Sequence, residues 1–127
     1  MSFPRPFLRL TGPVLNAPDP ALLAAFYREL LGWHTESEEP DWVKLRGPGG
    51  TGSLAFQIDP DFVPPVWPGS PGEARMTMHL DIETDDLAEA VGRAIELGAR
   101  EAGYQPEEDV RVCLDPIGHV FCFWTRT

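Results

Sequence analysis

Two polar residues that could do chemistry together, His79 and Asp81, lie two positions apart in the sequence. In the segment 75–83, apolar and polar side chains alternate, a pattern typical of a β-strand with one buried face. Because side chains two positions apart on a strand share a face, His79 and Asp81 are expected side by side. The pair could act as a general base with an orienting carboxylate, or it could orient a bound ligand through hydrogen bonds.

Other candidate side chains are expected on the outer faces of neighbouring strands. Alternation in the segments 42–46 and 53–58 leaves Trp42 and Gln57 on the face away from the core. A third group is aromatic, because Trp42 could combine with Trp67 and Trp124 into the walls of a pocket for a planar or apolar molecule. The alternative is that these tryptophans belong to an ordinary core.

The two cysteines, Cys113 and Cys122, flank the segment 115–118, which we interpret as a hairpin turn. If Leu114 pairs with His119, the cysteines are diagonal neighbours, about 7–8 Å apart between Cα atoms. That separation exceeds comfortable disulfide reach, so we predict free thiols in a reducing compartment. Cys122 could be a nucleophile, or it could pack inertly among apolar neighbours that raise the pKa of its thiol.

Helix signals occur twice along the chain. Asp19 can cap a helix that begins at Pro20, and Gly32 can end it in a left-handed conformation. Asp86 and Gly98 repeat this scheme, 67 and 66 residues after Asp19 and Gly32. This period is longer than that of solenoid repeats and the unit occurs twice, which indicates a duplicated module rather than an array of short repeats.

Each half of the sequence contains one strand before its helix and three after it. The predicted strands are 7–17, 33–37, 42–46 and 53–58 in the first half, and 75–83, 100–104, 110–114 and 119–125 in the second. Five prolines between the halves exclude a central strand there. We therefore predict a single α+β domain spanning residues 1–127, with modules at 7–58 and 75–125 and a proline-rich linker at 59–74.

The charge balance excludes several classes of partner. The 127 residues include 20 Asp and Glu against 10 Lys and Arg, a formal net charge of −10 at pH 7. Because phosphate recognition needs clustered positive charge, we predict no binding to nucleic acid or to an anionic membrane surface. No apolar run approaches the roughly 18–20 residues of a membrane span, and the first residues lack a secretory signal pattern. We expect a cytoplasmic protein.

Several motifs carry a family resemblance. The first module contains Asp19-Pro20 and then Phe26-Tyr27-Arg28-Glu29-Leu30-Leu31-Gly32-Trp33. The second contains His79-Leu80-Asp81-Ile82 and ends with Asp115-Pro116-Ile117-Gly118-His119-Val120-Phe121-Cys122. In order and spacing the chain resembles the vicinal oxygen chelate superfamily, which includes glyoxalase I, extradiol dioxygenases and bleomycin-resistance proteins. It looks like the small glyoxalase-like domain proteins common in actinobacteria, and the resemblance covers about residues 8–125.

The resemblance implies a specific architecture. Two βαβββ modules would form a curved mixed sheet with the helices outside and a ligand on the concave face, and the protein would be a homodimer. In the last strand, the comparison places Val120, Cys122 and Trp124 in the cleft. It places Phe121 and Phe123 in the core.

The resemblance also indicates where a metal would lie. Metal-dependent members bind a divalent ion through His, Glu or Gln side chains at four strand positions. Carried over, these positions fall at Gly12 (or Pro13 if the register slips), Gln57, His79 and Cys122. Glycine has no donor, the Gln57 amide is a weak one, and no carboxylate stands at a ligand position. We therefore predict no metal and no other cofactor, with a divalent ion at His79 as the alternative.

The sequence favours a small-molecule binding protein with an aromatic and polar cleft, and sequestration of a drug-like compound is one version of that function. The predicted ligand-binding residues are Trp42, Gln57, Trp67, His79, Asp81, Cys122 and Trp124. The alternative is an enzyme, either a metal-dependent lyase, isomerase or dioxygenase, or a metal-free one in which His79 and Asp81 perform acid–base catalysis. The expected partners are a small-molecule ligand and a second copy of the chain.

Overall fold

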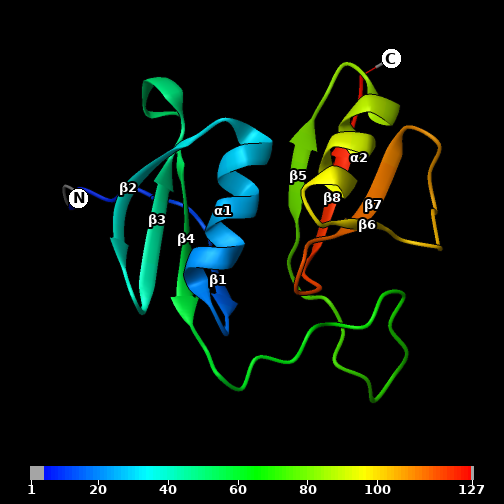
Figure 1. The fold of residues 1–127 in the computed structure, drawn as a ribbon, viewed down its shortest axis with the longest axis horizontal. Helices are drawn as coiled ribbons and strands as arrows, with labels where there is room; N and C mark the ends of the chain where they lie inside the picture. The colour runs from blue at the N-terminus through cyan, green and yellow to red at the C-terminus, as the bar shows by residue number, and fades with distance from the viewer. Residues whose placement is uncertain (1–4, 127) are drawn as a thin grey trace, which may run out of the picture.

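The computed structural model describes residues 5–126, and they form two similar units side by side (Figure 1). In each unit, one strand leads into a helix and three strands follow. The first unit contains β1 (Val14–Ala17), α1 (Pro20–Leu31), β2 (His34–Glu39), β3 (Trp42–Arg46), a 3₁₀ turn (Pro48–Gly50) and β4 (Ser53–Ile58). The second contains β5 (Leu80–Glu83), α2 (Leu87–Glu96), β6 (Arg100–Glu101), β7 (Val110–Leu114) and β8 (Val120–Trp124). The predicted α+β fold with two βαβββ modules is confirmed.

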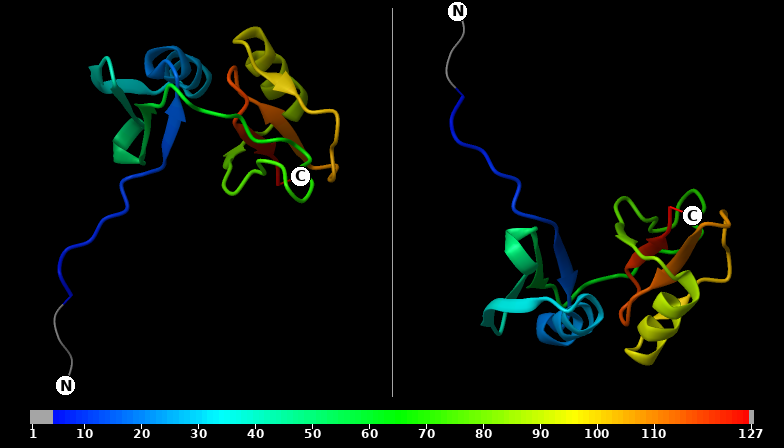
Figure 2. Two further views of the ribbon diagram at one scale, coloured as in Figure 1. Left: turned by 90° about the horizontal axis from the view of Figure 1, so that it is seen from below. Right: turned by 90° about the horizontal axis from the view of Figure 1, so that it is seen from above.

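The mixed sheet consists of two four-stranded sheets, ordered β1-β4-β3-β2 and β5-β8-β7-β6. In both, the first strand of the module pairs in parallel with the last, and the remaining pairs are antiparallel. Both helices lie on the same side of the sheets (Figure 2). Each sheet therefore has one face covered by a helix and one outer face.

The helix ends follow the predicted capping chemistry. The Asp19 carboxylate accepts a hydrogen bond from the Leu22 amide at 3.4 Å, and Gly32 ends α1 at a φ of 72°. In α2, the Asp86 carboxylate accepts from the Glu89 amide at 3.0 Å. Across residues 5–126, no helix is long and apolar enough to cross a membrane.

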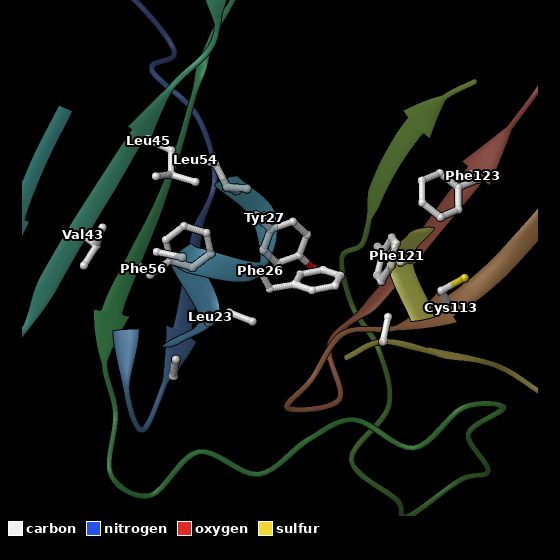
Figure 3. Close-up of a cluster of buried hydrophobic side chains, with 14 of the residues drawn as sticks. Leu23, Phe26, Tyr27, Val43, Leu45, Leu54, Phe56, Cys113, Phe121 and Phe123 are labelled. Carbon is white, nitrogen blue, oxygen red and sulfur yellow. The ribbon is translucent and has the colours of Figure 1, made fainter. Parts of the chain in front are cut away.

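A single aromatic core joins the two modules (Figure 3). The Phe26 and Tyr27 rings of α1 lie 5.9 and 6.0 Å from the Phe121 ring of β8, and Tyr27 also stacks on Phe56 of β4 at 5.8 Å. Edge-to-face and stacked rings at these distances attract one another beyond the burial of their area. The face of α1 that carries Phe26 and Tyr27 therefore packs against both sheets.

A buried hydrogen bond reinforces this junction. The Tyr27 hydroxyl donates to the Asp115 carboxylate at 2.7 Å, and the same carboxylate accepts from the backbone amides of Ile117, Gly118 and His119 at 3.0–3.1 Å. Burial raises the pKa of Asp115, and burial together with the Asp115 charge raises that of Tyr27. This carboxylate shapes the β7–β8 hairpin and ties it to α1.

Three of the predicted strands are shorter than expected at one end. The ladders begin at Val14 rather than residue 7 and at Leu80 rather than residue 75, and β6 ends at Glu101 rather than residue 104. Residues 75–79 do not pair with β8, so the alternation there does not set side-chain direction. As a result Met78 is 80% exposed, although alternation through the segment 75–83 would place it on the buried face, and Met76 packs on the outer face.

The β7–β8 hairpin has a different register from the predicted one. Leu114 pairs with Val120 rather than His119, because the carboxylate of Asp115 holds the five residues between them in a loop. Cys122 is opposite Val112. Cys113 and Cys122 are both buried and both free, as predicted.

Replacing Phe26 with alanine should lower the free energy of unfolding by about 3–5 kcal/mol, because it leaves a cavity between the modules. Leu22 is the matched control: it lies on the same helix but is 54% exposed, so Leu22→Ala should cost less than about 1 kcal/mol. Urea denaturation followed by circular dichroism measures both. Equal losses in the two variants would contradict the assigned helix face.

Candidate functional site

A pocket of about 380 Å³ lies on the outer face of the second sheet. The linker crosses this face of the module, opposite α2 (Figure 2). The pocket brings together five of the seven predicted ligand-binding residues, namely Trp67, His79, Asp81, Cys122 and Trp124. Its other lining residues are Met76, Pro106, Glu107, Val110, Val112 and Val120.

The polar part of the pocket is built by the parallel β5–β8 ladder. Asp81 and Cys122 are register partners, so their side chains emerge side by side. His79 precedes Asp81 by two residues, and its Nε2 lies 3.0 Å from Asp81 Oδ1. One donor atom from each of these three residues lies within 4.8 Å of the others. The side chains of His79 and Asp81 are 37% and 61% exposed, whereas Cys122 is buried.

The apolar part consists of a sheet floor and two tryptophans. Val112, Val120 and Cys122 form a buried cluster on this face, and Trp67 and Met76 pack against it. The Trp67 indole donates to the Tyr104 carbonyl at 3.3 Å, which joins the linker to the segment that follows β6. The pocket thus offers flat apolar area beside a hydrogen-bonding pair.

The surroundings of Cys122 make it a poor nucleophile. Burial, followed by the negative charges of Asp81 and Glu107, raises the pKa of its thiol to about 11. The reactive species is the thiolate, so at neutral pH the side chain is protonated and weakly reactive. This agrees with inert packing rather than covalent chemistry.

Trp42 and Gln57 do not enter this pocket. They are register partners on β3 and β4, on the outer face of the other sheet. The Gln57 amide donates to the Asn16 side-chain oxygen at 2.8 Å, and the Asn16 amide donates to Asp59 at 3.1 Å. Within one chain, therefore, Gln57 does not face His79 across a shared cleft.

Two residues in or near the site, Glu107 and His119, are not among the predicted ligand-binding residues. Glu107 lines the pocket but is not among the predicted ligand-binding residues, and the acidic run 107–109 carries no pattern that would have indicated this role. His119 directly follows the segment 115–118 that we interpret as the hairpin turn. Its backbone does bond to Asp115, but its ring Nε2 lies 2.8 Å from the Asn16 carbonyl oxygen and its ring packs on Phe62.

The four metal positions implied by the resemblance do not come together. At Gly12 the backbone has a φ of 150°, and an added Cβ would lie 2.0 Å from the Ser53 carbonyl oxygen, so no ligating side chain fits there. Gln57 is engaged with Asn16 on the other sheet. Only His79 and Cys122 of the four positions reach the pocket.

Comparison with known proteins places the chain in a family. The sequence model of the glyoxalase-like domain matches residues 13–124. The chain therefore belongs to the glyoxalase-like domain family of the vicinal oxygen chelate superfamily. A search of curated proteins finds no match.

Solved structures share the fold over nearly the whole chain. A glyoxalase/bleomycin resistance protein/dioxygenase family enzyme from Burkholderia phytofirmans PsJN superposes with a TM-score of 0.70 at 18% identity, covering 92% of this chain and 98% of the other. A glyoxalase family protein from Enterococcus faecalis gives 0.65 at 21% identity, with coverage of 93% and 98%. An antibiotic binding protein from Streptomyces sp. CB03234 gives 0.63 at 20% identity, with coverage of 95% and 98%. At these identities the likeness establishes the fold.

The structure predicts that position 12 has no room for a side chain, and the free energy of unfolding of a Gly12 variant tests this. Gly12→Ala should lower the free energy of unfolding by about 1–3 kcal/mol, because the methyl group collides with the backbone of Ser53. Gly92 is the matched control: it lies in α2, and an added Cβ there meets nothing within 4 Å. Gly92→Ala should raise stability by about 0.5–1 kcal/mol. Thermal or urea denaturation checks both, and a neutral Gly12→Ala would contradict the close contact.

Proposed function

We propose that this protein binds a small, planar and largely apolar molecule in the pocket on the outer face of its second sheet. The observation that carries the proposal is the convergence of Trp67, Trp124 and the His79–Asp81 pair on one pocket. Ligand sites commonly combine apolar walls with a few placed polar groups that fix orientation. Here the tryptophans supply flat area, and the imidazole and carboxylate orient a polar group of the ligand.

Sequestration of a drug-like compound is the version of this function that we favour. An antibiotic binding protein is among the proteins that share the fold. A binder needs no reactive group, and the protonated, buried thiol of Cys122 is unreactive. The incomplete set of family metal positions, with glycine at 12 and cysteine at 122, supports a degenerate metal site. The two free thiols support a reducing, cytoplasmic location.

We further propose that the protein is a homodimer. The N-terminal segment 5–10 extends away from the body of the chain (Figure 2), and its side chains Phe7, Leu8 and Leu10 are 79–96% exposed. Exposed apolar clusters of this kind mark contact surfaces. A second copy would also provide the route by which Trp42 and Gln57 of one protomer approach the pocket of its partner.

An enzyme remains the second candidate, and one observation favours it. The 3.0 Å contact between His79 Nε2 and Asp81 Oδ1 is the arrangement of a general base with an orienting carboxylate. If the pair is catalytic, His79→Ala and Asp81→Asn should both abolish turnover of a bound compound. A bound compound that is recovered unchanged after long incubation supports the binder.

Ligand binding should quench the fluorescence of the pocket tryptophans. In a screen of planar drug-like compounds, His79→Ala and Trp124→Ala should each weaken binding of a hit by about tenfold or more, which corresponds to about 1.4 kcal/mol. His34→Ala is the matched control, because His34 is exposed and lies outside the pocket. Unchanged affinity in both pocket variants, with folding verified by circular dichroism, would refute the assignment of the site.

Sedimentation velocity tests the dimer. The wild-type chain should sediment as a dimer at micromolar concentration, and Leu8→Ser with Leu10→Ser should shift it towards monomer by removing exposed apolar area. The control pair Glu38→Ser with Glu39→Ser alters exposed polar residues and should leave the dimer intact. A wild-type monomer at all concentrations would contradict the proposal.

A further inference from the structure

We propose that His79, Asp81 and Cys122 form a binding site for a thiophilic divalent ion of the zinc class. The three side chains differ from the four positions of the family resemblance in two respects. Asp81 is not among those positions, and all three residues come from the second module alone, from β8, from β5 and from the residue that precedes β5. The site needs no contribution from the first module.

The donor atoms are close enough to share one ion. They lie within 4.8 Å of one another, and an ion with bonds of about 2.0–2.3 Å to nitrogen, oxygen and sulfur holds its ligands about 3.3–3.8 Å apart. His79 and Asp81 already meet at 3.0 Å. Both side chains are more than one third exposed, so they can rotate towards Cys122. The required adjustment is confined to exposed side chains, because Asp81 and Cys122 are held by the β5–β8 ladder and His79 adjoins its first residue.

The types of donor select the ion. A thiolate and an imidazole favour zinc and related borderline ions, whereas magnesium and calcium require six or more oxygen ligands. The cluster offers one carboxylate and no second oxygen donor among its three residues. Three protein ligands leave a fourth position open, as in zinc sites that exchange a water or a ligand. We therefore expect the ion to bind reversibly, so that a chelator removes it from the protein.

The open position faces the pocket, because all three side chains line it together with Trp67 and Trp124. A ligand that carries an oxygen or nitrogen donor could complete the coordination while its apolar part lies against the tryptophans. This last step rests on the proposed small-molecule function. The ion site itself does not, since it is defined by protein atoms alone.

The test is titration of the untagged, chelator-treated chain of residues 1–127 with Co²⁺, which reports thiolate ligation through a near-ultraviolet charge-transfer band, and with Zn²⁺ by calorimetry. We expect binding of one ion per chain. Cys122→Ser should abolish the charge-transfer band, and Asp81→Asn should weaken zinc binding by about tenfold or more. Because Asp81 is exposed, that variant should fold normally.

Cys113→Ser is the matched control. Cys113 is also buried but packs in the core on the helix side of the sheet, so its loss should leave the band unchanged. Absence of ion binding, or binding that persists in both Cys122→Ser and Asp81→Asn, would overturn the proposal.

A second experiment separates the metal site from the proposed small-molecule function: the tryptophan quenching titration is repeated once in the presence of a chelator and once in the presence of zinc. Quenching in chelator without ion binding refutes only the metal site, and ion binding without any quenching refutes only the small-molecule function.

Discussion

The buried hydrogen bond between Tyr27 and Asp115 joins the helix of the first module to the hairpin of the second. Around it, the rings of Phe26, Phe56 and Phe121 form one core shared by both sheets. A buried carboxylate is costly unless its oxygens are paired, and here one hydroxyl and three amides pair them. The relative position of the modules depends on this arrangement.

This junction lies on the helix side of both sheets, so the shared core does not occupy their outer faces. On the second sheet, the free face carries the pocket, because β5 and β8 place Asp81 beside Cys122 there. On the first sheet, the corresponding face carries Trp42 and Gln57. The shared aromatic core and the buried hydrogen bond thus lie on the helix side of the sheets, while His79, Asp81 and Cys122 lie on the outer side.

Within the pocket, each polar group is influenced by its neighbours. Asp81 contacts His79 directly, and its charge adds to burial in raising the pKa of the Cys122 thiol. A cation placed among the three groups would reverse that influence, because a positive charge favours the carboxylate and the thiolate. In the functions we propose, the same three residues orient an organic ligand when no ion is present and hold an ion when one is supplied.

The sequence by itself determined the features that depend on local chemistry. Asp19, Gly32 and Asp86 predicted the helix ends, because capping involves residues three or four positions apart. Alternation predicted that His79 and Asp81 share a face; His79 adjoins the first paired residue, Leu80, and its ring meets Asp81 at 3.0 Å. The same alternation was wrong for Met78, because the segment 75–79 has no partner in β8 that would hold it in a pleated strand.

Only the tertiary structure decided which faces come together. It separated Trp42 and Gln57 from the other five predicted ligand-binding residues, and it added Glu107 from a loop with no recognisable signal. It also paired Tyr27 with Asp115, 88 positions apart. Such contacts depend on how two sheets and a shared core pack in three dimensions, and packing between distant segments leaves no periodic pattern in a single sequence.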